Sequence, residues 1–397
     1  MSKWQQVKLG DVSESCLGKM LDQHKNKGEL QPYLANIDVR WGEFDLEQLG
    51  EMKFELHEQE RYGLRYGDLV ICEGGEPGRC AIWKDQIPNM KIQKALHRVR
   101  ADLNVLDNRF LFYWFLLAGK TGELEQYFTG ATIKHMPGQK LKEVKIPLPP
   151  LEIQRKIADV LSAYDDLIEN NRKQIKLLEE AAQRLYKEWF IDLRFPGHED
   201  TKIIDGIPEG WEKKKLGDIA YESGKSVKKE DRDNYECYLP IDCLPSKSLV
   251  YTMCNDVSLA ESSLSSFDHG DIIFGSMRPY FHKVVIAYNK GLTRSTCFVI
   301  NSFENSFWSF LVMTLFSTGT IEYATQISVG TTMPYVRWKD FQQMPLLIPT
   351  KSIAEKFNIE FMPISKKLIF LSKQINALQI ARDRLLPKLI SGELEVK

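Results

Sequence analysis

Hydrophobic residues recur at alternating intervals of four and three positions in two segments, each at the end of one half of the chain. In the first segment the stripe consists of Tyr164, Ile168, Asn171, Ile175, Leu178, Ala182, Leu185 and Trp189. In the second it consists of Ile364, Leu368, Leu371, Ile375, Leu378, Arg382, Leu385 and Leu389. This spacing is the a/d pattern of a coiled-coil helix. Each segment is therefore predicted to form one long helix with a narrow apolar stripe.

A single helix of this kind would leave its apolar stripe in water. The two helices are therefore expected to pack on each other as an antiparallel coiled coil. The residues expected in that contact are Ile168, Ile175, Leu178, Leu185 and Trp189 on the first helix and Leu368, Ile375, Leu378, Leu385 and Leu389 on the second. The alternative is two unrelated amphipathic helices, each packed only on its own domain.

The chain contains one sequence twice. Residues 110–190 and 310–390 correspond without a gap at a shift of 200, so that Gly130 matches Gly330. Upstream, the two copies drift out of this fixed register. Two copies of about half the chain predict two similar domains related by a rough two-fold axis. Such a protein is suited to a two-fold ligand, of which duplex DNA is the commonest.

The remainder of each copy has mixed character. Short apolar runs bounded by turn residues predict strands at 68–72, 271–274, 284–287 and 297–300. Each copy also has one strongly apolar stretch, at 109–117 and 307–317, which is too short to cross a bilayer and is expected to be a buried helix. The fold class is therefore α+β, with two mixed α/β domains and two long helices. The predicted divisions are 1–147, 148–195, 196–210 (a linker rich in Pro and Gly), 211–348 and 349–397.

Composition narrows the function. The 397 residues include 53 Lys and Arg against 54 Asp and Glu, a net charge of −1. A free-standing DNA-binding protein is usually basic, so this balance disfavours tight DNA binding by the chain alone. The seven cysteines are odd in number and show no C-x-x-C motif. They are expected to be reduced thiols in a cytoplasmic protein that binds no metal.

The sequence lacks the motifs of common enzyme sites. It has no P-loop, no H-E-x-x-H, no G-x-S-x-G and no Gly-rich loop followed by a dinucleotide-binding helix. The Gly-rich residues 74–78 contain a proline and a glutamate and suit a tight turn better than a phosphate-binding loop. The chain is therefore expected to have no catalytic residues and no cofactor of its own.

Basic residues beside glycine, aromatic or amide residues are the candidates for DNA contact. Two Gly-Lys loops fit a phosphate contact, because glycine permits close backbone approach and lysine supplies a mobile cation. Arginines on turns beside predicted strands fit guanine recognition. The Gly-x-Thr loops offer hydroxyl and amide donors. The candidates are Lys19, Lys25, Lys27, Arg40, Trp41, Arg79, Lys94, Thr132, Lys134, His135, Lys225, Lys228, Arg278, His282, Lys283, Arg294 and Thr332.

For each candidate, an ordinary solvated surface position is the alternative. A further basic run, consisting of Lys91, Lys94, His97, Arg98 and Arg100, fits a phosphate track or an exposed strand equally well.

Several motifs, in order and duplicated, resemble those of the specificity subunits of type I restriction–modification systems, the HsdS family. They are Trp-x-x-x-x-Leu-Gly-Asp at 4–11 and 211–218, Gly-x-Thr at 130–132 and 330–332, Ile-Pro-Leu-Pro-Pro-Leu-Glu-Ile-Gln at 146–154, Trp-Phe at 189–190, the Pro- and Gly-rich linker, and Leu-Pro-Lys-Leu-Ile-Ser-Gly at 386–392. The resemblance covers essentially the whole chain. The second copy departs from it at 349–355, which reads Pro-Thr-Lys-Ser-Ile-Ala-Glu.

This resemblance implies two target-recognition domains, each reading one half of a split DNA sequence. It also implies that the helices space these domains and dock two modification (methyltransferase) subunits, with restriction (translocase) subunits joining the full complex. S-adenosylmethionine, ATP and Mg are then expected in those partners, and no membrane is involved. About 25 heptad residues at about 1.5 Å each make a rod of about 38 Å, close to the roughly 34–36 Å of one turn of B-DNA.

Two other classes of protein remain as alternatives. A self-contained DNA methyltransferase or nuclease would need a methyl-donor motif or a carboxylate–lysine cluster, and neither is evident. A pure protein–protein adaptor built on the helical hairpin would not need two domains with duplicated Gly-Lys loops.

Overall fold

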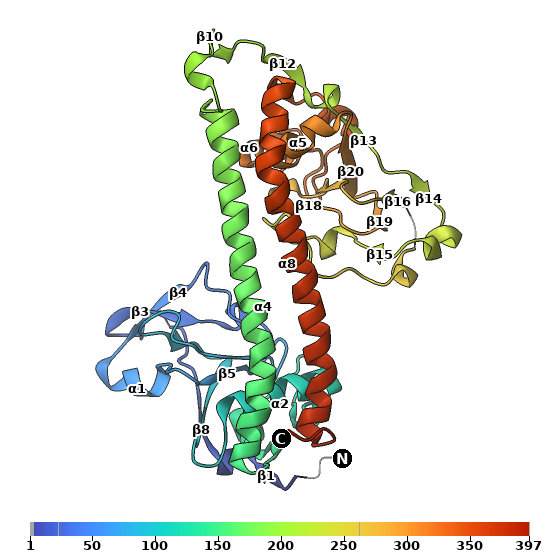
Figure 1. The fold of residues 1–397 in the computed structure, drawn as a ribbon. Helices are drawn as coiled ribbons and strands as arrows, with labels where there is room; N and C mark the ends of the chain where they lie inside the picture. The colour runs from blue at the N-terminus through green and yellow to red at the C-terminus, as the bar shows by residue number, and fades with distance from the viewer. Residues whose placement is uncertain (1–3, 23, 262, 397) are drawn as a thin grey trace. The chain divides into compact units, whose positions relative to one another are not determined.

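The computed structural model describes residues 4–22, 24–261 and 263–396 and divides into two compact units (Figure 1). Unit 1 consists of residues 1–166 and 379–397, and unit 2 of residues 167–378. Met1, Ser2 and Lys3, which belong to the first predicted domain, lie outside the described residues. Each unit therefore combines one mixed domain with parts of both helical tails, a division different from the predicted sequence domains.

The mixed domain of unit 1 is built on two sheets. Its four-stranded antiparallel sheet has the order β2 (Ser13–Leu17), β8 (Leu96–Ala101), β5 (Leu69–Cys72) and β6 (Cys80–Ile82). The second sheet has the order β4 (Gly50–Phe54), β3 (Glu29–Leu34) and β7 (Lys91–Ile92). A separate pair joins β1 (Gln6–Lys8) to β9 (Lys145–Pro147). The helices are α1 (Gln59–Tyr62), α2 (Asn108–Thr121) and α3 (Gly138–Glu143).

Unit 2 repeats this plan. One sheet has the order β13 (Ala220–Glu222), β20 (Cys297–Ser302), β17 (Ile272–Gly275) and β18 (Val284–Ile286). The other has the order β14 (Ser226–Val227), β16 (Leu264–Phe267), β19 (Gly291–Arg294) and β15 (Cys237–Tyr238). The remaining pairs join β12 (Glu212–Lys215) to β21 (Pro345–Ile348) and β10 (Ile203–Ile204) to β11 (Ile207–Pro208). Its shorter helices are α5 (Trp308–Leu315), α6 (Thr318–Gln326) and α7 (Trp338–Phe341). The predicted strands and buried helices, and the α+β class, are confirmed.

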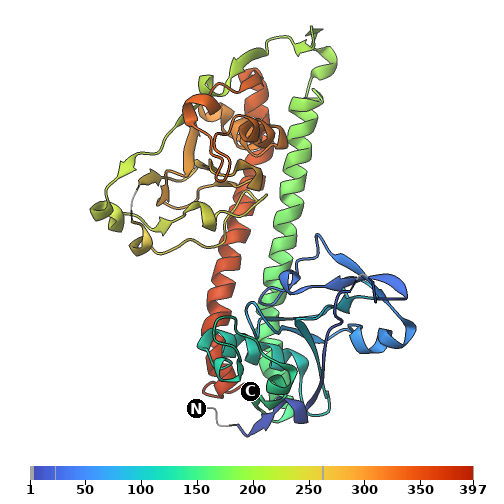
Figure 2. The same cartoon turned by 180° about the vertical axis from the view of Figure 1, so that it is seen from behind.

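Two long helices, α4 (Leu151–Tyr186) and α8 (Lys351–Ser391), form the predicted tails (Figure 2). Within unit 2 they run antiparallel: Asn171 Nδ2 donates to Gln374 Oε1 at 3.0 Å, and the ring of Trp189 lies 5.6 Å from that of Phe357. The predicted packing residues of this part lie in one core, either buried or packed against it. They are Ile168, Ile175, Leu178, Leu185, Trp189, Leu368, Ile375 and Leu378.

Within unit 1 the two helices are also antiparallel and close the domain core. Ile157 and Leu161 of α4 share a buried cluster with Leu386 and Leu389 of α8, and Leu385 packs against it. Arg382 occupies one position of the predicted apolar stripe and makes polar contacts there. Its Nη1 lies 2.5 Å from Asp165 Oδ1, and Tyr113 OH donates to the same carboxylate at 2.6 Å. The alternative of two unrelated helices is therefore wrong.

Cys237 and Cys254 form a disulfide, with their Cα atoms 5.7 Å apart. The residues that follow them, Tyr238 and Asn255, pair as an isolated antiparallel bridge. The expectation that all seven cysteines are reduced is thus wrong for this pair. The free thiols are Cys16, Cys72, Cys80, Cys243 and Cys297.

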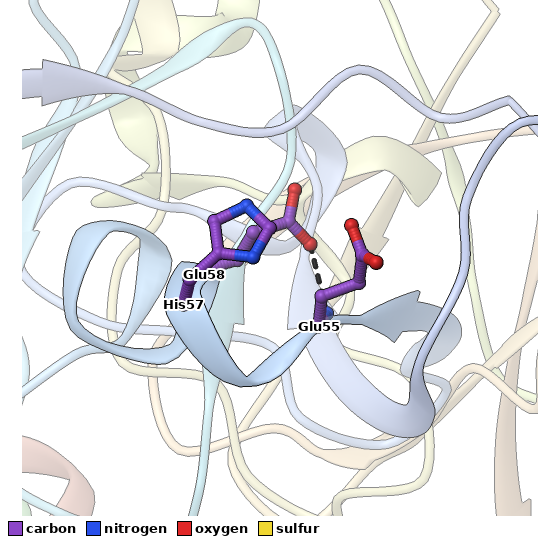
Figure 3. Close-up of side chains that lie close together, drawn as sticks. All are labelled: Glu55, His57 and Glu58. Carbon is purple, nitrogen blue, oxygen red and sulfur yellow. Dashed lines mark hydrogen bonds between the residues drawn. The ribbon is translucent and has the colours of Figure 1, made fainter.

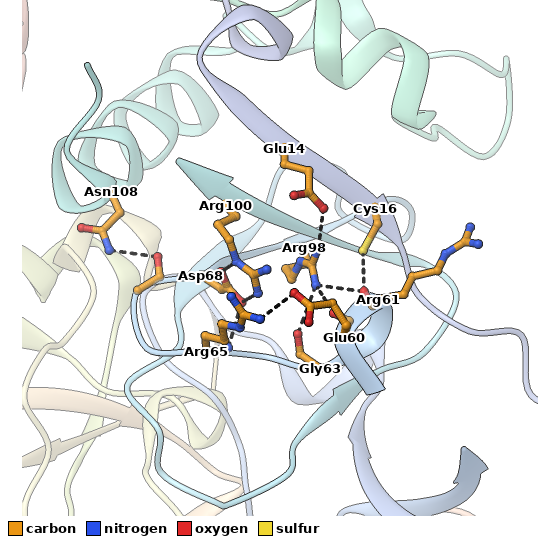
Figure 4. A network of polar contacts seen from close by, with 11 residues as sticks. Glu14, Cys16, Glu60, Arg61, Gly63, Arg65, Asp68, Arg98, Arg100 and Asn108 are labelled. Carbon is orange, nitrogen blue, oxygen red and sulfur yellow. Dashed lines mark hydrogen bonds and ion pairs between the residues drawn. The ribbon is translucent and has the colours of Figure 1, made fainter. Parts of the chain in front are cut away.

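Of the five residues in the basic run at 91–100, only Lys94 is exposed, so the run forms neither a continuous phosphate track nor an exposed strand. The Arg98 side chain is buried, and its guanidinium donates to the backbone carbonyls at 60, 61 and 63, at and just beyond the end of α1, and to Glu14 (Figure 4). Arg100 forms a two-bond fork with Asp68, both bonds 2.8 Å long. These arginines satisfy carbonyls and a buried carboxylate, so they stabilise the fold of unit 1.

Candidate nucleic-acid interface

Four loops of unit 1 are tied together beside the ends of its sheet strands. They are residues 36–38, 73–79, 93–95 and 129–135, here called the loop cluster. Glu73 N donates to Ala95 O at 2.8 Å, and Met136 N donates to Glu73 O at 2.7 Å. The ends of the last loop are closed by reciprocal backbone bonds between Thr129 and His135. Seven of the ten candidate residues of this unit lie in or next to these loops.

Unit 2 contains the same loop cluster, formed by residues 241–243, 276–283, 294–296 and 329–335. Ser276 N donates to Thr296 O at 2.9 Å, and Val336 N donates to Ser276 O at 2.9 Å. Val329 and Tyr335 close their loop by reciprocal backbone bonds. These backbone bonds match the ones just named in unit 1, so the duplicated sequence builds a similar loop platform twice.

A cation at the same place in each unit fastens the first loop. Arg79 Nη2 donates to Asn36 O at 3.0 Å, and Lys283 Nζ donates to Ile241 O at 2.8 Å. In unit 1 a single carboxylate, that of Glu76, also accepts from Arg79 Nη1 at 3.0 Å. Both cations therefore position loops, and some of their hydrogen-bond donors are already used before a ligand binds.

Trp41 is held on the same carboxylate. Its indole N–H donates to Glu76 Oε1 at 2.6 Å, and its ring covers Gly119 of α2 so closely that a Cβ there would lie 2.2 Å from it. The neighbouring Arg40 is exposed and ion-paired with Asp45 at 3.5 Å. Lys94 is also exposed, on the turn at 93–95. Arg40 and Lys94 are thus accessible to a ligand.

The Gly-x-Thr loop of unit 1 forms one wall of a cavity of about 540 Å³, whose lining includes Trp41, Phe128 and residues 131–134. Thr132, Lys134 and His135 are all exposed. Gly130 has φ +94°, and a Cβ there would lie 2.3 Å from Ile133 O, so this turn requires glycine. The exposed hydroxyl, ammonium and imidazole groups suit polar contact with phosphate or base edges.

The candidates of unit 2 differ in accessibility. Arg294 and Thr332 are exposed. Arg278 is half-buried, and its Nη2 donates to Thr332 O at 3.3 Å. Burial lowers the pKa of His282, whose Nε2 lies 2.9 Å from Phe316 O. A neutral imidazole bonded to a carbonyl is an unsuitable phosphate partner, so its structural surroundings weigh against a direct role for His282.

The two Gly-Lys loops have unlike surroundings. Lys19 is buried and ion-paired with Glu58, and its ammonium also donates to Lys53 O at 2.9 Å. Lys225, its counterpart, is exposed. Burial and pairing weigh against a phosphate contact by Lys19. Four lysines of these segments are exposed and stay candidates for DNA contact: Lys25, Lys27, Lys225 and Lys228.

Glu55, His57 and Glu58 are the one grouping of three potential metal ligands found among the described residues (Figure 3). Their ligand atoms lie within 4.8 Å of one another. Glu58 Oε2 also accepts from the backbone N–H of Glu55 at 2.9 Å, and Lys19 already neutralises this carboxylate. Within this cluster Glu58 therefore serves to hold the Lys19 ammonium in place.

Three residues of the loop clusters are not among the candidates predicted from the sequence. Asn36 joins three loops of unit 1, because its side-chain amide donates to Gly74 O at 2.8 Å and to Ala95 O at 3.5 Å, and its own carbonyl accepts from Arg79. Tyr280 and Phe281 are exposed aromatic residues on loop 276–283 of unit 2. Aligning 73–79 with 276–283 would have shown that the aromatic pair has no counterpart in the first copy.

Comparison with known proteins agrees with this architecture. Residues 1–180 and 208–378 match the family described as the type I restriction modification DNA specificity domain. The chain is 34% identical over 306 residues to the type I restriction enzyme MjaIX specificity subunit of Methanocaldococcus jannaschii, which covers 73% of this chain and 70% of that protein. It is 25% identical to the MjaVIII specificity subunit of the same organism, over 99% of this chain and 93% of that one.

The fold is also similar to a solved structure. The S subunit of a type I restriction–modification system from M. genitalium superimposes with a TM-score of 0.59 at 17% identity, covering 98% of this chain and 96% of that one. Among the described residues, no helix has the length and apolar character needed to span a membrane. On the family match and the identity to MjaIX, the chain belongs to the specificity-subunit family of type I restriction–modification systems.

Proposed function

We propose that each unit reads one half of a two-part DNA sequence through its loop cluster, and that the chain catalyses nothing itself. The observation that supports this most strongly is the duplication of the loop cluster, in which the same set of backbone hydrogen bonds joins the loops of both units. A ligand for two similar surfaces must itself present two similar surfaces, as duplex DNA does. Exposed threonine, lysine and arginine side chains on these loops supply the donors that phosphates and base edges accept from.

α4 and α8 are proposed to set the spacer between the half-sites and to dock two modification subunits. Continuous helices that enter the cores of both units transmit a change of length from one to the other. Inserting one heptad at matching places in α4 and α8 is expected to lengthen the spacer of the methylated sequence. An unchanged spacer in such a variant contradicts this role.

S-adenosylmethionine, ATP and Mg belong, in this proposal, to the modification and restriction subunits. The net charge of −1 fits a chain that holds DNA firmly only within such a complex. The isolated chain is expected to bind DNA weakly and with strong salt dependence. Nanomolar, sequence-specific binding without partners contradicts this expectation.

The testing experiment is co-expression of the chain with a type I modification subunit, followed by mapping of methylated adenines in the host DNA. The proposal predicts a motif with two short specific parts and an unspecified gap. A continuous motif contradicts two-part reading. Methylation by the purified chain alone in the presence of S-adenosylmethionine contradicts the absence of catalysis and favours a self-contained methyltransferase.

A further inference from the structure

An exposed aromatic cluster lies on the loop cluster of unit 2. Tyr280 and Phe281 are 49% and 45% exposed, with ring centroids 4.8 Å apart. Met333 and Tyr335 are also exposed, on the adjoining Gly-x-Thr loop. Single exposed apolar side chains are common, but four on two joined loops form a patch that is typical of a binding site.

The backbone around the aromatic pair is strained in a way that the first copy avoids. Gly74 bridges to His135 as Met277 bridges to Tyr335, which makes Gly75 the counterpart of Arg278. Gly75 has φ +72°, a conformation that costs glycine nothing, whereas Arg278 has φ +49°. A residue with a Cβ is disfavoured in this left-handed region.

At the other end of the turn, too, a left-handed glycine of unit 1 corresponds to a left-handed non-glycine residue of unit 2. Gly78, with φ +91°, precedes Arg79 and β6, whereas His282, with φ +52°, precedes Lys283 and β18. Between these left-handed residues unit 2 has three residues, Pro279–Phe281, where unit 1 has only a Glu-Pro pair. The second copy thus accepts strain at both ends of a longer, aromatic turn.

Those two strained residues fasten the turn. Arg278 N donates to Pro334 O at 2.7 Å and its guanidinium to Thr332 O. At the other end, His282 lies against the ring of Phe316, with centroids 4.8 Å apart, in addition to its bond to the Phe316 carbonyl. The aromatic pair is therefore presented to solvent on a fixed support.

Charge around the aromatic pair favours a nucleic-acid ligand over a protein. Lys247 is exposed and its backbone N–H donates to His282 O at 2.8 Å, while Arg294 is exposed on the adjoining turn. With Arg278 these make three cations, against the exposed carboxylate of Asp242. Aromatic side chains among cations are what stacking on bases beside phosphates requires.

We propose that Tyr280 and Phe281 form an apolar wedge that enters the half-site read by unit 2 and unstacks one base step there. The proposal rests on the function proposed above and deepens it. Unit 1, with its Glu76-Pro77 turn, reads its half-site without such a wedge. The two halves of the target are then recognised differently: one by contact alone and one by contact plus deformability of the DNA.

The test uses the complex of the full chain with its modification subunits and duplexes carrying 2-aminopurine at successive positions outside the methylated adenine. Wild-type complex is expected to raise the fluorescence at one step of the unit 2 half-site. The double variant Tyr280→Ala/Phe281→Ala is expected to abolish that rise and to weaken binding roughly tenfold to a hundredfold. The salt dependence stays the same, because no phosphate contact is removed.

Two further variants serve as matched controls. Phe303→Ala removes an aromatic residue of unit 2 that is 62% exposed and lies on another loop, and it is expected to change neither signal nor affinity. Tyr280→Phe keeps the ring and is expected to keep the wedge signal. Because all three positions are exposed, thermal unfolding of the variants should match that of wild type.

Three outcomes overturn the wedge. An unchanged 2-aminopurine signal in the double variant shows that the pair does not enter the base stack. Loss of co-purification with the modification subunits shows that the patch docks protein instead. A wild-type complex with no preference for the methylated sequence overturns the proposed function itself, and the wedge with it, so the two failures are distinguishable.

Discussion

The carboxyl group of Glu179 couples the stability of unit 2 to pH. Glu179 lies on α4 and is buried, and its Oε1 accepts from Ser248 Oγ and from Leu249 N, both at 2.7 Å. Burial raises the pKa of this carboxyl to about 7, and the two hydrogen bonds only partly oppose the shift. At neutral pH the helix therefore holds a half-titrated acid against the 248–249 loop.

The sign and size of the effect follow from linkage. Because the folded pKa lies above the ordinary value of 4.5, the folded state binds the proton more tightly than the unfolded state. Its stabilising effect is complete below pH 4.5 and is lost as pH rises through about 7. Since one pKa unit corresponds to ~1.4 kcal/mol, ionisation costs unit 2 about 3 kcal/mol, or roughly 6–12 °C in Tm for a domain of this size.

Glu179→Gln keeps the shape of the side chain but cannot ionise. Calorimetric melting of the full chain from pH 5 to pH 8 is expected to show wild type and variant close together at pH 5, with the variant higher by most of that interval at pH 8. Glu180→Gln is the matched control, because the Glu180 side chain is 41% exposed and ion-paired with Arg184 at 3.3 Å, and it is expected to follow wild type. Parallel pH curves for Glu179→Gln and wild type would show that Glu179 does not couple stability to pH.

Two further stability predictions concern unit-specific packing. Gly119→Ala is expected to lower the unfolding free energy of unit 1 by roughly 1–3 kcal/mol, because the new Cβ meets the Trp41 ring. At the corresponding Gly319 a Cβ would meet nothing within 4 Å, so Gly319→Ala is expected to be neutral or stabilising by up to about 1 kcal/mol. Equal urea midpoints for the two variants would contradict this. Arg382→Met leaves the partly buried Asp165 carboxylate without its cation and is expected to cost roughly 2–4 kcal/mol in urea unfolding. The double variant with Asp165→Leu should recover most of that loss, and no recovery argues against the pairing.

The helical tails were predictable because their signal is periodic. Every contact residue proposed from the heptad pattern lies in a core or packs against one. The pattern could not show that the end of α8 completes the core of unit 1, since an apolar stripe specifies that a helix is covered and not by which segment. Leu386 and Leu389 became assignable to that core only in three dimensions.

The loop clusters were predictable only in part. Thr132 and Thr332 were found from repeated motifs, and both are exposed as a ligand contact requires. Lys19 and Lys225 share a Gly-Lys motif, yet one is buried because Glu58, far away in sequence, folds against it. A local motif carries no information about such a distant partner.

The two loop clusters are proposed to be the surfaces that touch DNA. Hydrogen–deuterium exchange of the complex with its modification subunits, measured with and without a duplex carrying the mapped sequence, tests it most directly. DNA is expected to slow exchange at 129–135 and 276–283 and at the loops joined to them. Protection confined to α4 and α8, or to the lysine loop at 24–28, with both clusters unaffected, would contradict it.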